Sequence, residues 1–466
     1  MLKTLVHVFQ IKELRNKILF TLGMLIVYRI GFWIPLPGVN QEAMVRYFQT
    51  ATQSGSAAGR AAQYVAIFSG GSFSRSTIFG LGIMPYITAA IIFQLLGSVS
   101  PALKKMQEEG PSGRIKIQEW TRYATVALCI VQGFGWITYM RATNLVYPEY
   151  LGNPIWWVTA VSALTAGTIF LMWLGEQIDR YGIGNGVSLI ITAGILTGMP
   201  RALQTLIASY DSTGTQGPNF IGVLMLAGGF FLVVGGAVLL TVAQRRIPIQ
   251  QAKHTRGRRV YGGQKNYLPL RVNHSGVMPI IFASSLMIFP SVIFEAIASA
   301  AKGTGSTGWW VTALDKLGEW AQMGQFPYVV AYIVLVYFFS YFWVTVQFNP
   351  DDMAKQLRDH GSFIPGLRPG PRTAEYLEAV IGRITYVGAG FLAIIAILPM
   401  VVNSSLKIDF AVTQFLGGTG LLIVVSVTLD LLQRIEASLL MRNYAGFLGG
   451  EDGSKSSAPR LRSPRG

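Results

Sequence analysis

The sequence predicts an all-α membrane protein with ten transmembrane helices. Of its 466 residues, 51% are hydrophobic and only 13% are charged, which is too apolar for a soluble protein of this length. Ten apolar windows approach the roughly 20 residues that a bilayer-spanning helix requires. These windows cover residues 18–34, 76–99, 120–140, 154–174, 187–206, 220–243, 276–298, 326–346, 384–402 and 412–432.

The distribution of basic residues predicts that both termini are cytoplasmic. Ten spans place the two termini on one side, and 29 of the 38 Lys and Arg residues fall in segments on that side. Cytoplasmic loops of membrane proteins carry such an excess. The first window is interpreted as a retained span and not as a cleaved signal, because Pro35-Leu36-Pro37-Gly38 follows it instead of a small-residue cleavage site.

The connection between the sixth and seventh windows, residues 244–275, contains eight basic residues and no Asp or Glu. We expect it to meet a large anionic partner on the cytoplasmic side. Gly257-Arg258-Arg259 and Gly262-Gly263 supply turn residues, so the pattern favours a hairpin over a flexible basic tail. A grip on anionic lipid is the alternative use of this charge.

The second long cytoplasmic connection, residues 347–383, balances five basic against five acidic residues. Three prolines stiffen its centre at residues 363–371. This pattern is typical either of a knob that contacts another protein or of a solvated loop, and the sequence leaves both open.

Two further features have alternative interpretations. Residues 61–72 are mildly apolar, end in glycines and are too short to span, so they form either a re-entrant helix or an extracytoplasmic surface helix. Pro85, Pro279, Pro290 and Pro399 lie within the apolar windows. They indicate kinks tolerated in tight helix packing, or hinges on which the bundle opens.

No pattern in the sequence predicts catalysis or metal binding. Cys129 is the only cysteine, and the four histidines lack the spacing of metal ligands. Gly182-Ile183-Gly184-Asn185-Gly186 follows no predicted strand, so it is interpreted as a tight turn between spans and not as a nucleotide-binding loop. We therefore expect no enzyme activity, no cofactor and no metal.

Several motifs, spread in order over nearly the whole chain, resemble the SecY family of bacterial protein-conducting channels. The stretches that carry the resemblance are Phe68-Ser69-Gly70-Gly71, Leu81 to Ile87, Gly175-Glu176, Gly182 to Gly186, Arg245-Arg246-Ile247-Pro248, Tyr261-Gly262-Gly263, Leu268-Pro269-Leu270, Phe282 to Ser285, Asn349-Pro350, Pro365 to Gly370 and Gly417-Gly418-Thr419.

The resemblance implies two inverted five-helix halves around an hourglass pore, with a short re-entrant plug helix. The halves would be residues 18–206 and 220–432, joined by an extracytoplasmic connection at 207–219. Residues 1–17 would form the cytoplasmic N-terminus, and 433–466 a cytoplasmic tail that is disordered at its end. Thr50–Arg60 and the long loop Lys302–Gln325 depart from the usual pattern of the family.

The resemblance also implies a ring of aliphatic side chains at the waist of the pore. By motif match its members are Ile83, Ile87, Val187, Ile191, Ile281 and Ile423. Such a ring offers a passing polypeptide no hydrogen bonds, and a narrow dry constriction resists ions. The pairs Ile83/Ile87 and Val187/Ile191 share a helix face at i,i+4 spacing, although this spacing is common in any membrane helix.

Further sites follow from the resemblance. The plug would lie near residues 61–75 and include Ile67, Phe68, Ser69, Gly70 and Gly71. A lateral gate between the windows 76–99 and 276–298 would include Gln94, Ser284, Ser285 and Phe289. The two cytoplasmic loops would dock the ribosome and the motor ATPase SecA through Arg256, Arg258, Arg259 and Arg368. SecE and SecG are the implied channel partners.

A protein-conducting channel for unfolded secretory proteins, with lateral release of membrane proteins into the bacterial plasma membrane, is therefore the leading functional prediction. A secondary solute transporter is the alternative. It usually needs ionisable groups near the membrane midplane, whereas Arg29, Glu295 and Asp430 all lie near the ends of the predicted spans. A membrane scaffold that only grips anionic lipid is the third possibility.

Overall fold

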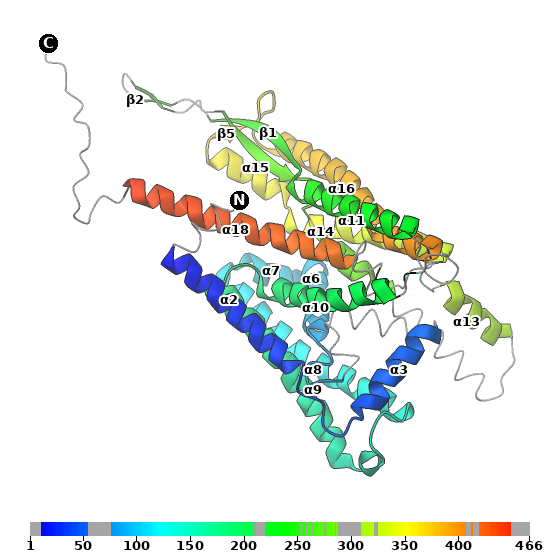
Figure 1. Ribbon diagram of the computed structural model, residues 1–466. Helices are drawn as coiled ribbons and strands as arrows, with labels where there is room; N and C mark the ends of the chain where they lie inside the picture. The colour runs from blue at the N-terminus through cyan, green and yellow to red at the C-terminus, as the bar shows by residue number, and fades with distance from the viewer. Residues whose placement is uncertain are drawn as a thin grey trace.

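The computed structural model is largely helical (Figure 1). It describes residues 11–54, 76–208, 210, 220–251, 254–256, 259–261, 265–274, 276–284, 286–287, 309–320, 325–406, 412 and 419–448. The predicted plug at 61–75, the gate residues Ser285 and Phe289, the loop residue Arg258 and the chain from 449 onward lie outside the described residues.

A first helix set packs around α9. Its elements are α2 (Lys12–Gly31), α3 (Gln41–Ser54), α6 (Met84–Val99), α7 (Pro101–Glu108), α8 (Pro111–Ala142), the 3-10 turn η1 (Pro148–Tyr150), α9 (Pro154–Tyr181) and α10 (Gly186–Ala208). Helix α9 contacts α2, α8 and α10, and α6 packs on α8. Asn153 caps α9 by accepting a hydrogen bond from the Ile155 N–H at 2.9 Å, because the first amides of a helix lack partners within it.

A second helix set repeats these pairings. Its elements are α11 (Phe220–Val242), helical residues 278–284, α13 (Trp309–Trp320), α14 (Phe326–Gln347), α15 (Pro350–Asp359), α16 (Pro371–Leu406) and α18 (Thr419–Leu448). Contacts α8–α9, α2–α10 and α2–α9 in the first set correspond in chain order to α14–α16, α11–α18 and α11–α16 in the second. Helix α10 contacts α18 and so joins the two sets.

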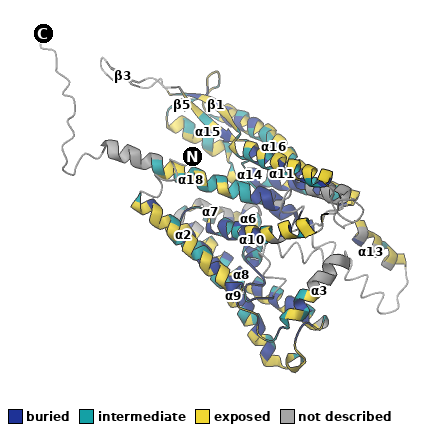
Figure 2. Ribbon diagram, viewed as in Figure 1, coloured by how far each residue is buried: buried dark blue, intermediate teal, exposed yellow. Residues whose placement is uncertain are grey.

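Among the described residues, six helices are long and apolar enough to cross a membrane. They are Ile115–Arg141, Pro154–Tyr181, Gly186–Ala208, Phe220–Val242, Phe326–Asp359 and Pro371–Leu398. Many exposed side chains on these helices are large and apolar, such as Leu224, Phe231 and Leu232 on α11 (Figure 2). Exposed apolar belts of this kind need lipid around them. The chain is thus a multi-pass membrane protein, and the number of ten spans remains a prediction.

The structure corrects several predicted boundaries. The window 76–99 is not helical throughout: residues 76–83 form turns, and α6 begins at Met84 with Pro85 in its first turn. Proline is favoured there because the first amides have no helical partner in any case, so Pro85 starts a helix and does not kink one. Pro279 likewise lies in the first turn of helical residues 278–284. Residues 433–448, predicted as part of a tail, continue α18.

The basic connection forms a hairpin, as its turn residues predicted. Strand β1 (Gln244–Gln251) pairs antiparallel with β4 (Lys265–Arg271), and β2 (His254–Arg256) pairs with β3 (Arg259–Tyr261). Alternation along β1 buries Ile247 and Ile249 and exposes the residues between and before them, which is the period of a half-buried strand. One strand of the second long connection, β5 (Ser362–Phe363), also pairs with β1.

Candidate functional site

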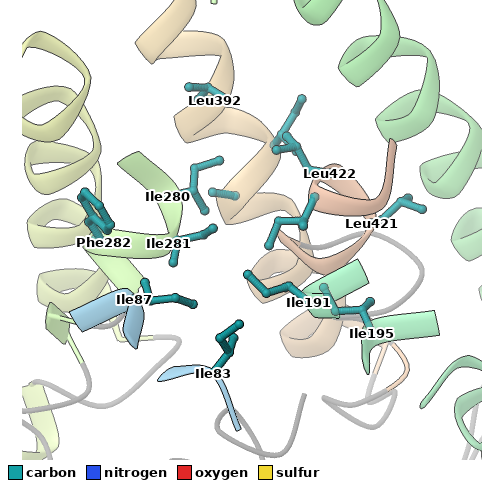
Figure 3. Packing of buried hydrophobic residues seen from close by; sticks show 14 of the residues in the cluster. Ile83, Ile87, Ile191, Ile195, Ile280, Ile281, Phe282, Leu392, Leu421 and Leu422 are labelled. Carbon is teal, nitrogen blue, oxygen red and sulfur yellow. The ribbon is translucent and has the colours of Figure 1, made fainter. Parts of the chain in front are cut away.

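The predicted waist residues are buried together in the largest apolar cluster of the described structure. Ile83, Ile87, Ile191, Ile281 and Ile423 are each no more than 7% exposed, and Val187 is half-buried against the same cluster. They come from four elements, because Ile83 and Ile87 lie at the start of α6, Ile191 on α10, Ile281 within 278–284 and Ile423 on α18. Figure 3 shows Ile83, Ile87, Ile191 and Ile281 pointing toward one another.

The start of α6 is held so that two of these side chains share one face. Ile83 is the N-cap of α6, and its carbonyl accepts a hydrogen bond from the Ile87 N–H at 3.1 Å. One helical turn therefore separates the two side chains. Before it, Gly82 adopts a φ of +58°, a conformation that glycine adopts readily.

A polar brace at the α9–α10 turn positions Val187 and Ile191. Gly184 has a φ of +98°, and the Gly186 N–H donates to Asp179 Oδ1 at 2.7 Å. This carboxylate satisfies an amide at the positive end of α10. Helix α10 approaches α9 so closely that a Cβ on Gly186 would overlap the carbonyl of Gly175. Asp179 thus has a structural role at this turn.

The chemistry of the predicted waist is that of an apolar cluster. The six side chains are aliphatic, so they offer neither charge nor hydrogen-bonding groups. Of the described residues, the buried polar side chains are threonines and serines, and no charged side chain is among them. The described part of the bundle therefore provides no buried ionisable site of the kind that ion-coupled transport uses.

Two of the predicted gate residues, Gln94 and Ser284, have different surroundings in the structure. Gln94 is half-buried on α6. Ser284 is buried, and its hydroxyl lies 2.7 Å from the Ile280 carbonyl and 3.0 Å from the Tyr332 hydroxyl of α14. The Ser284 hydroxyl is thus bonded within the second helix set. Tyr332 had no signal in the sequence, because it lies 48 residues from Ser284.

The chain is anchored directly after the predicted plug. Ser76 has a φ of +45°, and its hydroxyl donates to Met140 Sδ at 3.3 Å. The Leu36 N–H donates to the Ser76 carbonyl at 2.9 Å, and Pro35 forms a β-bridge with Thr77. These contacts attach residue 76 to the loop after α2 and to α8, which defines where a movable segment before it would end.

The two long connections share a sheet and an apolar cluster. Ile247 and Leu270 of the hairpin, Ile364 of the second connection, and Leu377 and Val380 of α16 are buried in a common apolar cluster. Arg256 and Arg259 lie opposite each other in the β2–β3 register, and Arg368 is exposed in the second connection. Strands β2 and β3 form a two-stranded sheet of their own, separate from the sheet of β4, β1 and β5. The shared packing therefore joins the base of the hairpin to the second connection.

The base of the hairpin is also tied to α18. Arg271 Nη2 donates to Gln433 Oε1 at 3.0 Å, and the Val272 N–H donates to the Ala243 carbonyl at 2.9 Å. Sequence reasoning missed this contact, because Gln433 was assigned to a tail. The link connects the base of the hairpin to the helix that carries Ile423.

Comparison with known proteins agrees with this architecture. The SecY family model matches residues 77–432. The chain is 40% identical over 460 residues to the "Protein translocase subunit SecY" of Chlamydia trachomatis serovar D, covering 96% of this chain and 98% of that one. It is 41% identical over 444 residues to the protein of the same name from Escherichia coli K12, covering 94% of each chain.

Solved structures show the same fold. The chain matches "The structure of a protein conducting channel" with a TM-score of 0.56 and 20% identity, covering 91% of this chain and 93% of that one. It matches "Sec61 in the Canine ribosome-channel complex from the endoplasmic reticulum" with a TM-score of 0.52 and 18% identity, at the same coverage. These findings confirm the predicted fold class and give no support to a solute transporter. The chain belongs to the SecY family and is a subunit of a protein-conducting channel.

Proposed function

We propose that unfolded secretory proteins cross the membrane through the point on which Ile83, Ile87, Ile191, Ile281 and Ile423 converge, with Val187 at its edge. The observation that carries this proposal is the common burial of these side chains from four elements. An aliphatic constriction closes on itself at rest and excludes ions by dewetting. It also releases a passing chain, because it makes no directional bonds with it.

The same proposal assigns the plug and the gate. Residues 61–75, with Ile67, Phe68, Ser69, Gly70 and Gly71, seal the pore and swing away up to the anchor at Ser76. The gate opens between α6 and residues 276–298, where Gln94, Ser284, Ser285 and Phe289 lie along the chain. Membrane proteins leave through it into lipid, and an apolar signal sequence favours the open state by binding it better than the closed state.

The cytoplasmic surface is the docking platform for the machines that feed the channel. Arg256, Arg258, Arg259 and Arg368 contact the ribosome or the SecA motor. Support comes from the shared sheet and apolar cluster of the two connections, which hold the base of the basic hairpin against the connection that carries Arg368. The solved Sec61 neighbour was captured in a ribosome–channel complex.

The remaining partners and the location follow from the family and the charge distribution. The channel works with SecE and SecG in the bacterial plasma membrane, and both termini face the cytoplasm. The excess of Lys and Arg on the side of the termini supports this orientation. The chain itself catalyses no reaction and takes no cofactor, since its partners or the proton-motive force supply the energy.

The pore assignment is tested with a secretory protein stalled during export. Photo-crosslinkers are placed at Ile87, Ile191 and Ile281, with a control at Leu224, which is exposed on α11. We expect crosslinks from the three waist positions to the stalled chain and from the control to lipid. The pore assignment fails if the stalled chain crosslinks to none of the three.

The docking assignment is tested by charge reversal. Arg258→Glu combined with Arg259→Glu should weaken ribosome binding. It should also make the negative slope of log affinity against log salt concentration shallower by about 1.5, because two phosphate contacts are lost. Arg245→Glu, at the exposed base of the hairpin, is the matched control. Membrane insertion should survive in both variants. Binding that is unchanged across the salt series would exclude these arginines as the contact.

A further inference from the structure

Helix α13 carries an exposed apolar face that the channel function does not use. Trp309, Ala313, Leu317 and Trp320 recur at i, i+4, i+8 and i+11, so they share one face of the helix. Trp309 is 85% exposed, Leu317 42% and Trp320 56%. Trp310, next to this face, is exposed as well. Three exposed tryptophans and a leucine on one short helix are unusual for a surface in contact with water alone.

The opposite face of α13 is polar. Thr312, Asp315 and Glu319 fall on it by helical register, whereas Lys316 lies beside Trp309 and Trp320 at i+7 and i−4. The net charge of the polar face is negative, so it has no electrostatic attraction for anionic lipid headgroups or nucleic acid. Gly318 is buried, and α13 contacts α14. The side near Gly318 thus packs on the protein, while the tryptophans remain uncovered.

The position of α13 along the chain places it at the level of a membrane surface. Helix α14 begins an apolar span at Phe326, which is itself 80% exposed. The five residues between Trp320 and Phe326 can cover at most about 20 Å, and the contact with α14 keeps α13 nearer still. Figure 1 shows α13 at the end of the molecule opposite to strands β1 and β5.

We propose that α13 lies in the headgroup–acyl boundary of the bilayer, with Trp309, Leu317 and Trp320 inserted in lipid. Tryptophan is enriched at this depth, because its ring is apolar and its N–H remains near water. An amphipathic helix with an apolar face binds there in the plane of the membrane. Insertion anchors the start of α14. The assignment of α13 to the extracytoplasmic leaflet rests on the proposed orientation of the chain. Its contact with lipid does not depend on that orientation.

The test uses the full-length chain in its purified complex, reconstituted in phosphatidylcholine vesicles. In a Cys129→Ser background, an environment-sensitive fluorophore is attached to Leu317→Cys on the apolar face or to Thr312→Cys on the polar face. We expect emission at 317 to be blue-shifted and quenched at least about twofold more by nitroxide-labelled lipid than emission at 312. Aqueous iodide should quench the label at 312 more strongly.

Controls separate lipid from other occupants. Changing salt from about 50 mM to about 500 mM should leave the lipid quenching at 317 unchanged, because the contact is apolar. Trp309→Ser combined with Trp320→Ser should reduce it and leave export through the waist intact. Equal iodide quenching at 312 and 317 overturns the proposal. A blue shift that fades on dilution of protein in lipid also overturns it, because a second copy of the chain would then cover the face.

Discussion

The Ser284–Tyr332 hydrogen bond leads to a prediction about protein stability. Removing its donor and removing its acceptor should lower the free energy of unfolding by different amounts. A serine hydroxyl has one proton, and Ser284 donates it to the Ile280 carbonyl at 2.7 Å. The hydrogen bond at 3.0 Å must therefore run from the Tyr332 hydroxyl to Ser284 Oγ. Both residues are buried, so a hydroxyl left without a partner is costly.

Tyr332→Phe removes the donor and leaves the Ser284 proton satisfied, so it should lower the free energy of unfolding by about 1 kcal/mol. Ser284→Ala leaves the Tyr332 hydroxyl buried without its acceptor, and should cost about 2 kcal/mol. The double variant lacks both hydroxyls, so its cost should be close to that of Tyr332→Phe alone. The two single costs then exceed the double cost by about 2 kcal/mol, which is the coupling energy of the pair.

Reversible unfolding in mixed detergent micelles, followed by near-UV circular dichroism, measures these differences. Tyr341→Phe is the control on the same helix, because Tyr341 is 40% exposed and its loss should change stability by no more than about 0.5 kcal/mol. Equal and additive costs for Ser284→Ala and Tyr332→Phe would refute the assigned direction of the bond. Export of a substrate with a weakened signal sequence should stay unchanged in Tyr332→Phe, because both residues belong to the second helix set.

Two other predictions follow from the packing. Ile87→Asn should raise the ion conductance of the resting channel in planar bilayers, because it places hydrogen-bonding groups in the dry waist. Ile92→Asn, at a 40% exposed position on the same helix, should not, and equal leakage would contradict a seal at Ile87. Gly186→Ala should destabilise the α9–α10 turn by more than about 1 kcal/mol, since its Cβ would overlap the Gly175 carbonyl. Gly228→Ala on α11 has open space around it and should be neutral or stabilising. Both glycine variants are measured by the same unfolding assay in mixed detergent micelles.

Much of the fold could be predicted from the sequence because its strongest signals are local. A bilayer requires long apolar helices, so hydropathy alone located the six spans that the structure describes in full. Turn chemistry at Gly257 and Gly262-Gly263 predicted the hairpin, since a short acid-free segment with paired turn residues has few other conformations. Local patterns failed where proline changed a boundary, as at Pro85, because an apolar window does not show where the helix begins.

Contacts between distant segments could not be predicted in this way. The pairing of β5 with β1 joins the two long connections, but strands of two and eight residues in separate loops show no mark of their partner. The Arg271–Gln433 contact is invisible for the same reason. Asp179 had a local signal, because an acidic residue before a glycine-rich turn that starts a helix favours its first amides.

The waist shows what spacing alone can and cannot establish. The i,i+4 pairs of Ile83/Ile87 and Val187/Ile191 are compatible with any packed membrane helix, and only the family resemblance selected them. The structure adds that four separate elements bury these side chains in one cluster. It does not describe residues 61–75, so the plug remains a prediction. The crosslinking and conductance experiments approach it through the predicted waist residues, such as Ile87.

An apolar meeting point between two helix sets is well suited to a gate that must open for substrates of every sequence. Ile83, Ile87 and Ile191 belong to the first set and Ile281 and Ile423 to the second, whereas Ser284 keeps its hydroxyl bonded inside the second set. Separating the sets at the waist therefore breaks dispersion and hydrophobic contacts, which are non-directional. An incoming apolar signal segment can restore such contacts whatever its residue order. A polar interface would instead require matching partners at fixed angles, and would restrict the channel to few substrates.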